Sequence, residues 1–286
     1  MTGYFIHIVT LAAIYIMVAL SYAIPVGYTG LLNLGHVGLL AVGAYTAAIL
    51  TTQGVSFWLV LPAAMLVSGL LGFLLALSSR HIKGDYYALV TLGFTFVVNA
   101  VLLNWLSLTR GPFGISGIDR PTLFDAPLAF LILTLLALTF VAVFVFRVTH
   151  SPFGRALEAV RDDELAAESL GKPVAKLKII SLTISGVLVG LAGAMLAHFL
   201  QFINPQIFWL DNVVWILAAL VIGGLASFPG AIWGTVILFA LFEAIRFLPL
   251  PIDLIGSLRL IIFAALLLLV ILFRPKGLLG KAQLEQ

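Results

Sequence analysis

The sequence contains no cysteine and few charged residues. Of its 286 residues, 9% are charged and 62% are hydrophobic, whereas about a quarter of the residues in soluble domains are charged. Without cysteine there is no disulfide, no thiolate nucleophile and no cysteine-ligated metal or cluster. The shortage of charge excludes an ordinary soluble globular protein.

A strong charge of one sign and a nucleotide-binding motif are also missing. Fifteen Lys and Arg stand against twelve Asp and Glu, so the chain has no basic face for nucleic acid. The phosphate-binding pattern G-x-x-x-x-G-K-[ST] does not occur, because Gly171-Lys172 continues into Pro173. We therefore expect no enzyme activity, no ATP hydrolysis and no cofactor or metal in this chain.

Long apolar runs dominate what is present. A helix needs about 20 apolar residues to cross a bilayer, and the runs are apolar on every face, unlike the alternating strands of a membrane barrel. The sequence predicts an all-α polytopic membrane protein, in one transmembrane domain over 1–286, with eight or nine hydrophobic segments. They are residues 4–24, 33–51, 56–79, 87–108, 125–147, 177–199, 212–226, 229–247 and 255–273.

Two of these segments are interrupted. Gly and Pro residues at 223–230 cut the run from 213 to 247, which indicates two broken or re-entrant helices rather than two full spans. Unwound backbone at membrane depth must be buried in protein or line a cavity.

The basic residues predict an orientation. Eleven of the fifteen fall at 80–83, 147–178 and 274–281, and short cytoplasmic loops are enriched in Lys and Arg. Even numbers of segments separate the three clusters, so all three can lie in the cytoplasm. This places the N-terminus outside, with 4–24 as a retained membrane segment rather than a signal peptide.

One long polar stretch, residues 149–178, is predicted to form a cytoplasmic loop of two short helices. Ser151 can cap the first helix, with Pro152 at its first position and an apolar stripe after it. Asp162 or Asp163 can cap the second, which ends near Gly171. Such a loop either rests its apolar face on lipid headgroups or docks on a partner protein through its small residues.

The docking alternative is favoured by a resemblance. Residues 154–171 read GRALEAVRDDELAAESLG, which resembles the G-R-A-x-x-A-I-R-x-x-E-x-A-A-x-x-x-G run of the branched-chain amino acid ABC transporter permeases. The sequence departs from the family pattern in three places. Asn33 stands where this family usually has Ser, Leu39 stands where Phe is usual, and Asp85-Tyr86 is the third. The further matches are GYTG at 27–30, LGH at 34–36, GAY at 43–45, YALVTL at 87–92, AGA at 192–194, GG at 223–224 and PG at 229–230.

The resemblance implies an importer subunit in a bacterial cytoplasmic (inner) membrane. It implies a second homologous permease, two ABC ATPase subunits that hydrolyse ATP, and an extracytoplasmic substrate-binding protein. Segment 152–171 would then be the coupling element that contacts an ATPase. Its residues that match the family motif are Arg155, Arg161, Glu164, Ala166, Ala167 and Gly171. The cargo is a branched-chain amino acid, or urea or a short amide as in relatives.

Four residues are candidates for the translocation path. Asn33 and His36 follow a Gly-rich stretch at the head of a short helix, where free backbone N–H groups can face a carboxylate. Gly223 and Gly224 mark a second break, and paired breaks point to a midplane pathway. In both places the alternative is plain packing, with His36 bonded to a neighbouring carbonyl.

Two other functions share this composition. An ion-coupled secondary transporter of amino acids or small amides needs an intramembrane carboxylate, for which Glu243 is the candidate, although Arg246 three residues later favours a structural pair. An intramembrane prenyltransferase needs aspartates that hold Mg²⁺ and a diphosphate. Asp162-Asp163 supplies one such pair, and a second cluster is missing.

Overall fold

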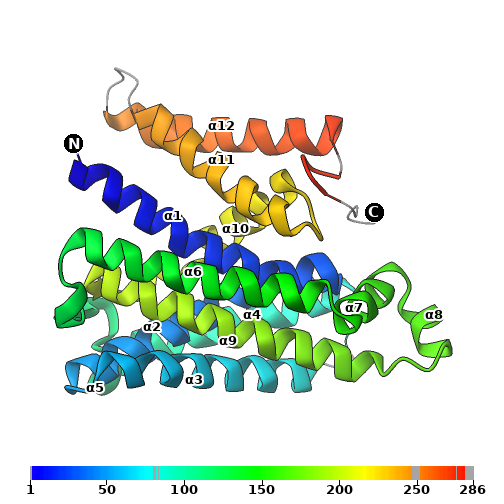
Figure 1. Cartoon of the computed structure of the whole chain (residues 1–286), viewed down its shortest axis with the longest axis horizontal. Coiled ribbons are helices and arrows are strands. Elements are labelled where there is room, and N and C mark those ends of the chain that lie inside the picture. The colour runs from blue at the N-terminus through cyan, green and yellow to red at the C-terminus, as the bar shows by residue number, and fades with distance from the viewer. Residues whose placement is uncertain (1, 80–81, 83, 247–251, 275, 281–286) are drawn as a thin grey trace.

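The computed structural model describes residues 2–79, 82, 84–246, 252–274 and 276–280, and these are almost entirely helical (Figure 1). Every one of the nine expected hydrophobic segments contains a helix. The nine are α1 (Thr2–Ala23), α2 (His36–Thr52), α3 (Phe57–Ser79), α4 (Asp85–Asn104), α6 (Pro127–Thr149), α9 (Val174–Leu200), α10 (Leu210–Gly223), α11 (Phe228–Arg246) and α12 (Ile252–Phe273). This confirms the predicted all-α polytopic membrane fold.

Among the described residues, six helices are long and apolar enough to cross a bilayer, judged by length and composition: those in 3–28, 57–78, 85–104, 127–149, 174–200 and 228–245. Helices α2 and α10 are shorter, with 17 and 14 residues. At 1.5 Å per residue, α10 is about 21 Å long, less than the roughly 30 Å of a hydrocarbon core. The sequence predicts two broken or re-entrant helices around residues 223–230 rather than two full spans. Helix α10 is too short for a full span, whereas α11 is long enough for one.

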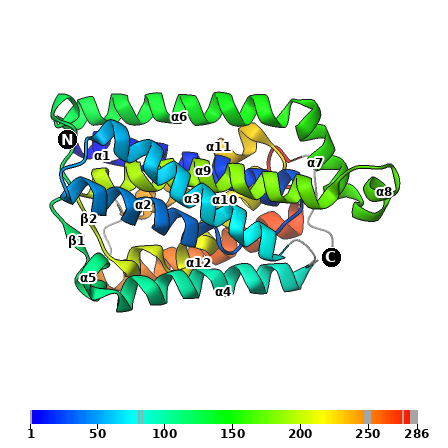
Figure 2. The ribbon, with the colours of Figure 1, turned by 90° about the horizontal axis from the view of Figure 1, so that it is seen from below.

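The long helices run roughly alongside one another between two ends of the molecule (Figures 1 and 2). One end, here called the strand end, carries α5 (Leu106–Thr109) and the antiparallel pair of β1 (Ile115–Ser116) and β2 (Phe202–Ile203). The other end, here called the loop end, carries α7 (Pro152–Asp162) and α8 (Glu164–Ser169). Helices α6 and α12 finish at the loop end, so two of the basic clusters share one side. Arg80 and Lys83 of the remaining cluster, and Lys281 of the last one, lie outside the described residues.

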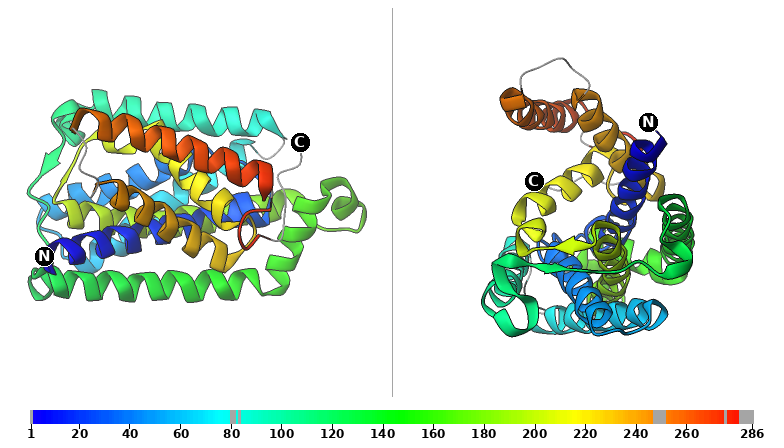
Figure 3. Two further views of the ribbon diagram at one scale, coloured as in Figure 1. Left: turned by 90° about the horizontal axis from the view of Figure 1, so that it is seen from above. Right: turned by 90° about the vertical axis from the view of Figure 1, so that its left-hand side faces the viewer.

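Helix α9 runs through the bundle and packs against both α2 and α3 (Figures 1 and 2). Glycines let the three backbones meet: a Cβ added at Gly190 would lie 2.6 Å from the carbonyl oxygen of Ala64, and one added at Gly186 would lie 2.9 Å from that of Ser68. Small residues four apart are what close helix packing in a membrane requires. Helices α11 and α12 instead project away from these three helices (Figure 3).

Candidate functional site

The loop from Thr149 to Lys178 folds as the sequence predicts. Ser151 caps α7 by accepting a hydrogen bond from the backbone N–H of Gly154 at 3.3 Å. Asp163 caps α8 in the same way, accepting from Ala166 N at 2.9 Å. Gly171 follows α8 with φ +79°, a left-handed conformation that costs glycine little. Two short helices joined at Asp163 are therefore confirmed.

The six residues that match the family motif differ in their exposure to solvent. Arg155, Ala166 and Gly171 are exposed, whereas Ala167 is buried within this chain. A large side chain at Ala167 would therefore disrupt the loop itself, and one at Gly171 would strain its backbone. Neither substitution can test docking alone.

Arg161 and Glu164 point back toward the bundle. The Nη1 of Arg161 donates to the carbonyl oxygen of Gly27 at 3.1 Å, and its Nε and Nη2 donate to Asp162. Glu164 forms a 2.7 Å ion pair with Lys178 on α9, whose side chain is only 7% exposed. These two contacts fix the loop on the helices, a role that spacing along the chain could not reveal.

The tip of the loop is apolar and unprotected. Leu165 is 68% exposed and Leu170 80% exposed, with Ala166 exposed between them. Figure 2 shows α8 beyond the ends of the long helices, away from the region that lipid would cover. We call Leu165, Ala166 and Leu170 the α8 tip; of these three residues, only Ala166 belongs to the family motif.

Asn33 and His36 are fully buried within this chain, and their role in the translocation path stays a prediction. The Oδ1 of Asn33 accepts from Gly35 N at 2.9 Å, and Leu34 N donates to Thr91 Oγ1 at 3.0 Å. The backbone N–H groups of Leu34 and Gly35 are thus occupied. The His36 ring lies 3.0 Å from Ser21 Oγ and 3.4 Å from Ser185 Oγ, and it stacks on Tyr22.

Gly223 and Gly224 lie where backbones crowd together. A Cβ at Gly223 would meet the carbonyl of Gly230, and one at Gly224 would meet the backbone of Gly280. The segment after α12 returns here, since Leu279 N donates to the Gly223 carbonyl at 2.9 Å. Close packing accounts for both glycines, and a role for them in the translocation path stays a prediction.

Both carboxylates of the prenyltransferase alternative have partners within the loop. Asp162 binds the Arg161 guanidinium and Asp163 caps α8. Within the described parts of the chain, no three His, Asp or Glu side chains converge as metal ligands would. The side chain of Arg246 lies outside the described residues, so its pairing with Glu243 stays a prediction.

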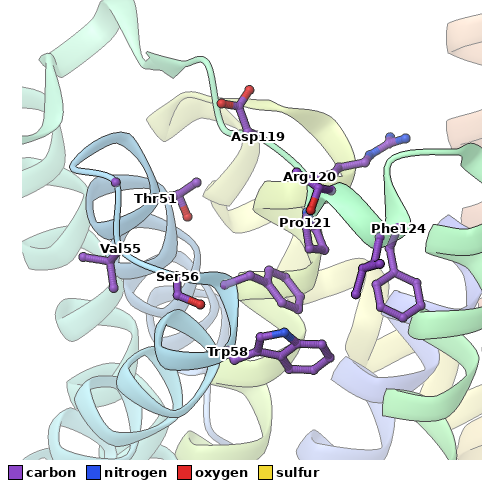
Figure 4. Close-up of a pocket in the computed structure, with 12 residues that line it drawn as sticks. Thr51, Val55, Ser56, Trp58, Asp119, Arg120, Pro121 and Phe124 are labelled. Carbon is purple, nitrogen blue, oxygen red and sulfur yellow. The ribbon is translucent and has the colours of Figure 1, made fainter.

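A cleft of about 300 Å³ opens at the strand end between α2, α3 and residues 119–124 (Figure 4). Sequence reasoning did not find it. Trp58 and Phe124 form its apolar part, while the Arg120 guanidinium turns away from them. That guanidinium donates to the carbonyl of Phe199 at 3.0 Å, near the end of α9. The cleft offers both apolar and polar contacts, the latter from Thr51, Ser56 and Asp119, and Arg120 is occupied in holding the fold.

Comparison with known proteins decides the family. The family described as branched-chain amino acid transport system / permease component matches residues 4–271. The chain belongs to this family. It is similar to the high-affinity branched-chain amino acid transport system permease protein LivM of Salmonella typhimurium, with 36% identity over 96% of this chain and 69% of that protein. It is likewise similar to LivM of Escherichia coli, at 35% identity over the same shares.

More distant relatives agree. The permease LivH of Escherichia coli is 26% identical over 97% of this chain and 95% of its own length. Among solved structures, PsaBC from Streptococcus pneumoniae in complex with Fab matches with a TM-score of 0.50 and 17% identity, covering 94% of this chain and 91% of that chain. That likeness supports the fold alone. The chain is therefore a multi-pass membrane protein of the branched-chain amino acid permease family.

Proposed function

We propose that this permease is a membrane subunit of an ATP-driven importer of branched-chain amino acids in a bacterial inner membrane. It would line the translocation path with a second homologous permease. An extracytoplasmic binding protein would deliver the substrate, and two ATPase subunits would bind at the loop end. The family and the LivM relatives support this assignment.

The observation that carries the ATPase contact is the apolar α8 tip. Exposed leucines on α3 or α4 face the lipid region, whereas Leu165 and Leu170 lie past the helix ends and gain nothing from lipid. Burying a leucine side chain contributes about 1.5 to 3 kcal/mol. A partner that covers both leucines therefore gains roughly tenfold or more in affinity from each.

The loop is braced as a coupling element must be. Arg161 and Glu164 attach α7 and α8 to the turn that follows α1 and to α9, so a push on the tip reaches the membrane helices instead of bending the loop. Work done on separate ATPases needs such a rigid path. A secondary transporter needs no such tip, and Glu243 is its only candidate relay.

Charge placed on the tip tests the proposal. Leu170→Asp, alone and with Leu165→Asp, should lower ATPase co-purification at least tenfold while the permease still inserts. Leu123→Asp is the matched control, because Leu123 is also 80% exposed but lies at the strand end. Equal ATPase recovery from the tip variants and the control would show that α8 does not dock.

A further inference from the structure

The break after α1 is anchored by the coupling loop. Helix α1 passes into a π-helical turn at Ile24–Tyr28, and the last carbonyls of a helix lack donors within it. The Gly27 carbonyl accepts from Arg161 instead. The aliphatic part of the same side chain covers Gly30, where an added Cβ would lie 3.0 Å from Arg161 Cγ.

Arg161 is held firmly in this position. Its side chain is 16% exposed, and two of its nitrogens bind Asp162 at 2.7 and 2.9 Å. Both bonds go to one oxygen, Oδ1 of Asp162, and with the bond from Nη1 to the Gly27 carbonyl they hold the guanidinium through all three of its nitrogens. A movement of α7 therefore displaces the Gly27 carbonyl rather than only rotating a loose side chain.

Gly27 also contacts the second helix break, which lies between α10 and α11. A Cβ added there would lie 2.7 Å from the backbone nitrogen of Ala226 and 3.1 Å from its Cα. Ala226 lies between α10 and α11 with φ +55°, a conformation unusual for a residue with a side chain. The two interruptions, 199 residues apart in sequence, meet backbone to backbone at this glycine.

The π-helical turn is linked through buried polar side chains to α9 and the start of α2. Thr29 Oγ1 lies 2.8 Å from Ser181 Oγ on α9 and also donates to the carbonyl of Ile24. One turn further along α9, Ser185 bonds both the carbonyl of Ser21 and the His36 ring. A displacement at Gly27 thus has a continuous path of contacts to the start of α2.

We infer that Arg161 is a positioning residue that transmits movement of α7 to both helix breaks through the Gly27 carbonyl. This rests on the proposed function, because it assumes that partner ATPases move α7. Arg161 is then not an ATPase contact, as the family motif alone implied, but the inward end of the coupling element. A residue that merely stabilises the loop would change assembly and leave the uptake achieved per ATP as it was.

The test uses the assembled importer in proteoliposomes, with ATP hydrolysis and labelled leucine uptake measured on the same sample. Arg161→Gln should keep ATP hydrolysis within about twofold while leucine uptake per ATP falls at least tenfold. Arg161→Lys, which retains a cationic donor, should show at least three times the leucine uptake per ATP of Arg161→Gln. Arg147→Gln, an exposed arginine at the same end of the molecule, should leave both activities unchanged.

A second variant reaches the junction from the other side. Gly27→Ala keeps Arg161 but forces Ala226 away, so uptake per ATP should fall in the same manner. If hydrolysis and uptake fall in step in both variants, or assembly is lost in both, Arg161 is structural and the inference is wrong. If the unaltered permease recruits no ATPase, the proposed function fails instead, which separates the two failures.

Discussion

The packing of α9 predicts opposite effects for the same substitution at two helical glycines. A Cβ added at Gly190 would lie 2.6 Å from the Ala64 carbonyl oxygen and 2.7 Å from Ser68 Cβ. Comfortable contacts are about 3.5 to 4.0 Å, so α3 must move by about 1 Å. Overpacking of this kind costs about 1 to 3 kcal/mol. At Gly93 on α4 nothing lies within 4 Å of the added Cβ.

The comparison isolates packing because both changes replace glycine by alanine inside a helix. Each substitution stabilises the folded chain by about 0.5 to 1 kcal/mol, because alanine loses less backbone entropy than glycine on folding. This gain cancels in the difference. Gly190→Ala should therefore be about 1 to 3 kcal/mol less stable than Gly93→Ala, a factor of roughly 5 to 150 in the unfolding constant. Tryptophan fluorescence during denaturation of the purified chain measures both. Equal stabilities would refute the close contact of α9 with α3.

Three further outcomes are expected. In this cysteine-free chain, Leu165→Cys should react with an impermeant thiol reagent only from the cytoplasm and Leu123→Cys only from outside; the reverse pattern would invert the topology. Glu164→Ala should lower the free energy of unfolding by about 3 to 5 kcal/mol in a thermal melt, because it leaves the buried Lys178 unpaired. Lys178→Met should cost less, since the Glu164 side chain that it leaves unpaired is 27% exposed. Gly171→Ala should lower the free energy of unfolding by about 1 to 2 kcal/mol, because φ at this position is +79°. Gly171→Asn should be closer to wild type in the same melt, since asparagine tolerates this conformation better than alanine.

The sequence predicts the helices well because their causes are local. Apolar runs of span length place the membrane segments, and the caps at Ser151 and Asp163 place the two loop helices. Gly171 ends the second helix for a reason visible in the sequence, since only glycine adopts that conformation at low cost.

The orientation of the loop is not local, and sequence reasoning missed it. Arg161 and Gly27 are 134 residues apart, and nothing in the spacing distinguishes an arginine that faces a partner from one that faces the bundle. The same holds for Ala166 and Ala167, adjacent residues of which one is exposed and one buried. Likewise, the burial of His36 follows from α1 and α9, which close over the head of α2.

The energy source of transport tests the central claim most directly. The importer, assembled from this permease, its partner permease and the ATPases, is placed in proteoliposomes with the binding protein outside. Labelled leucine should accumulate only when ATP is enclosed at the loop end, and a proton or sodium gradient should have no effect. Leucine uptake by this permease alone, driven by an ion gradient without ATP, would contradict the account.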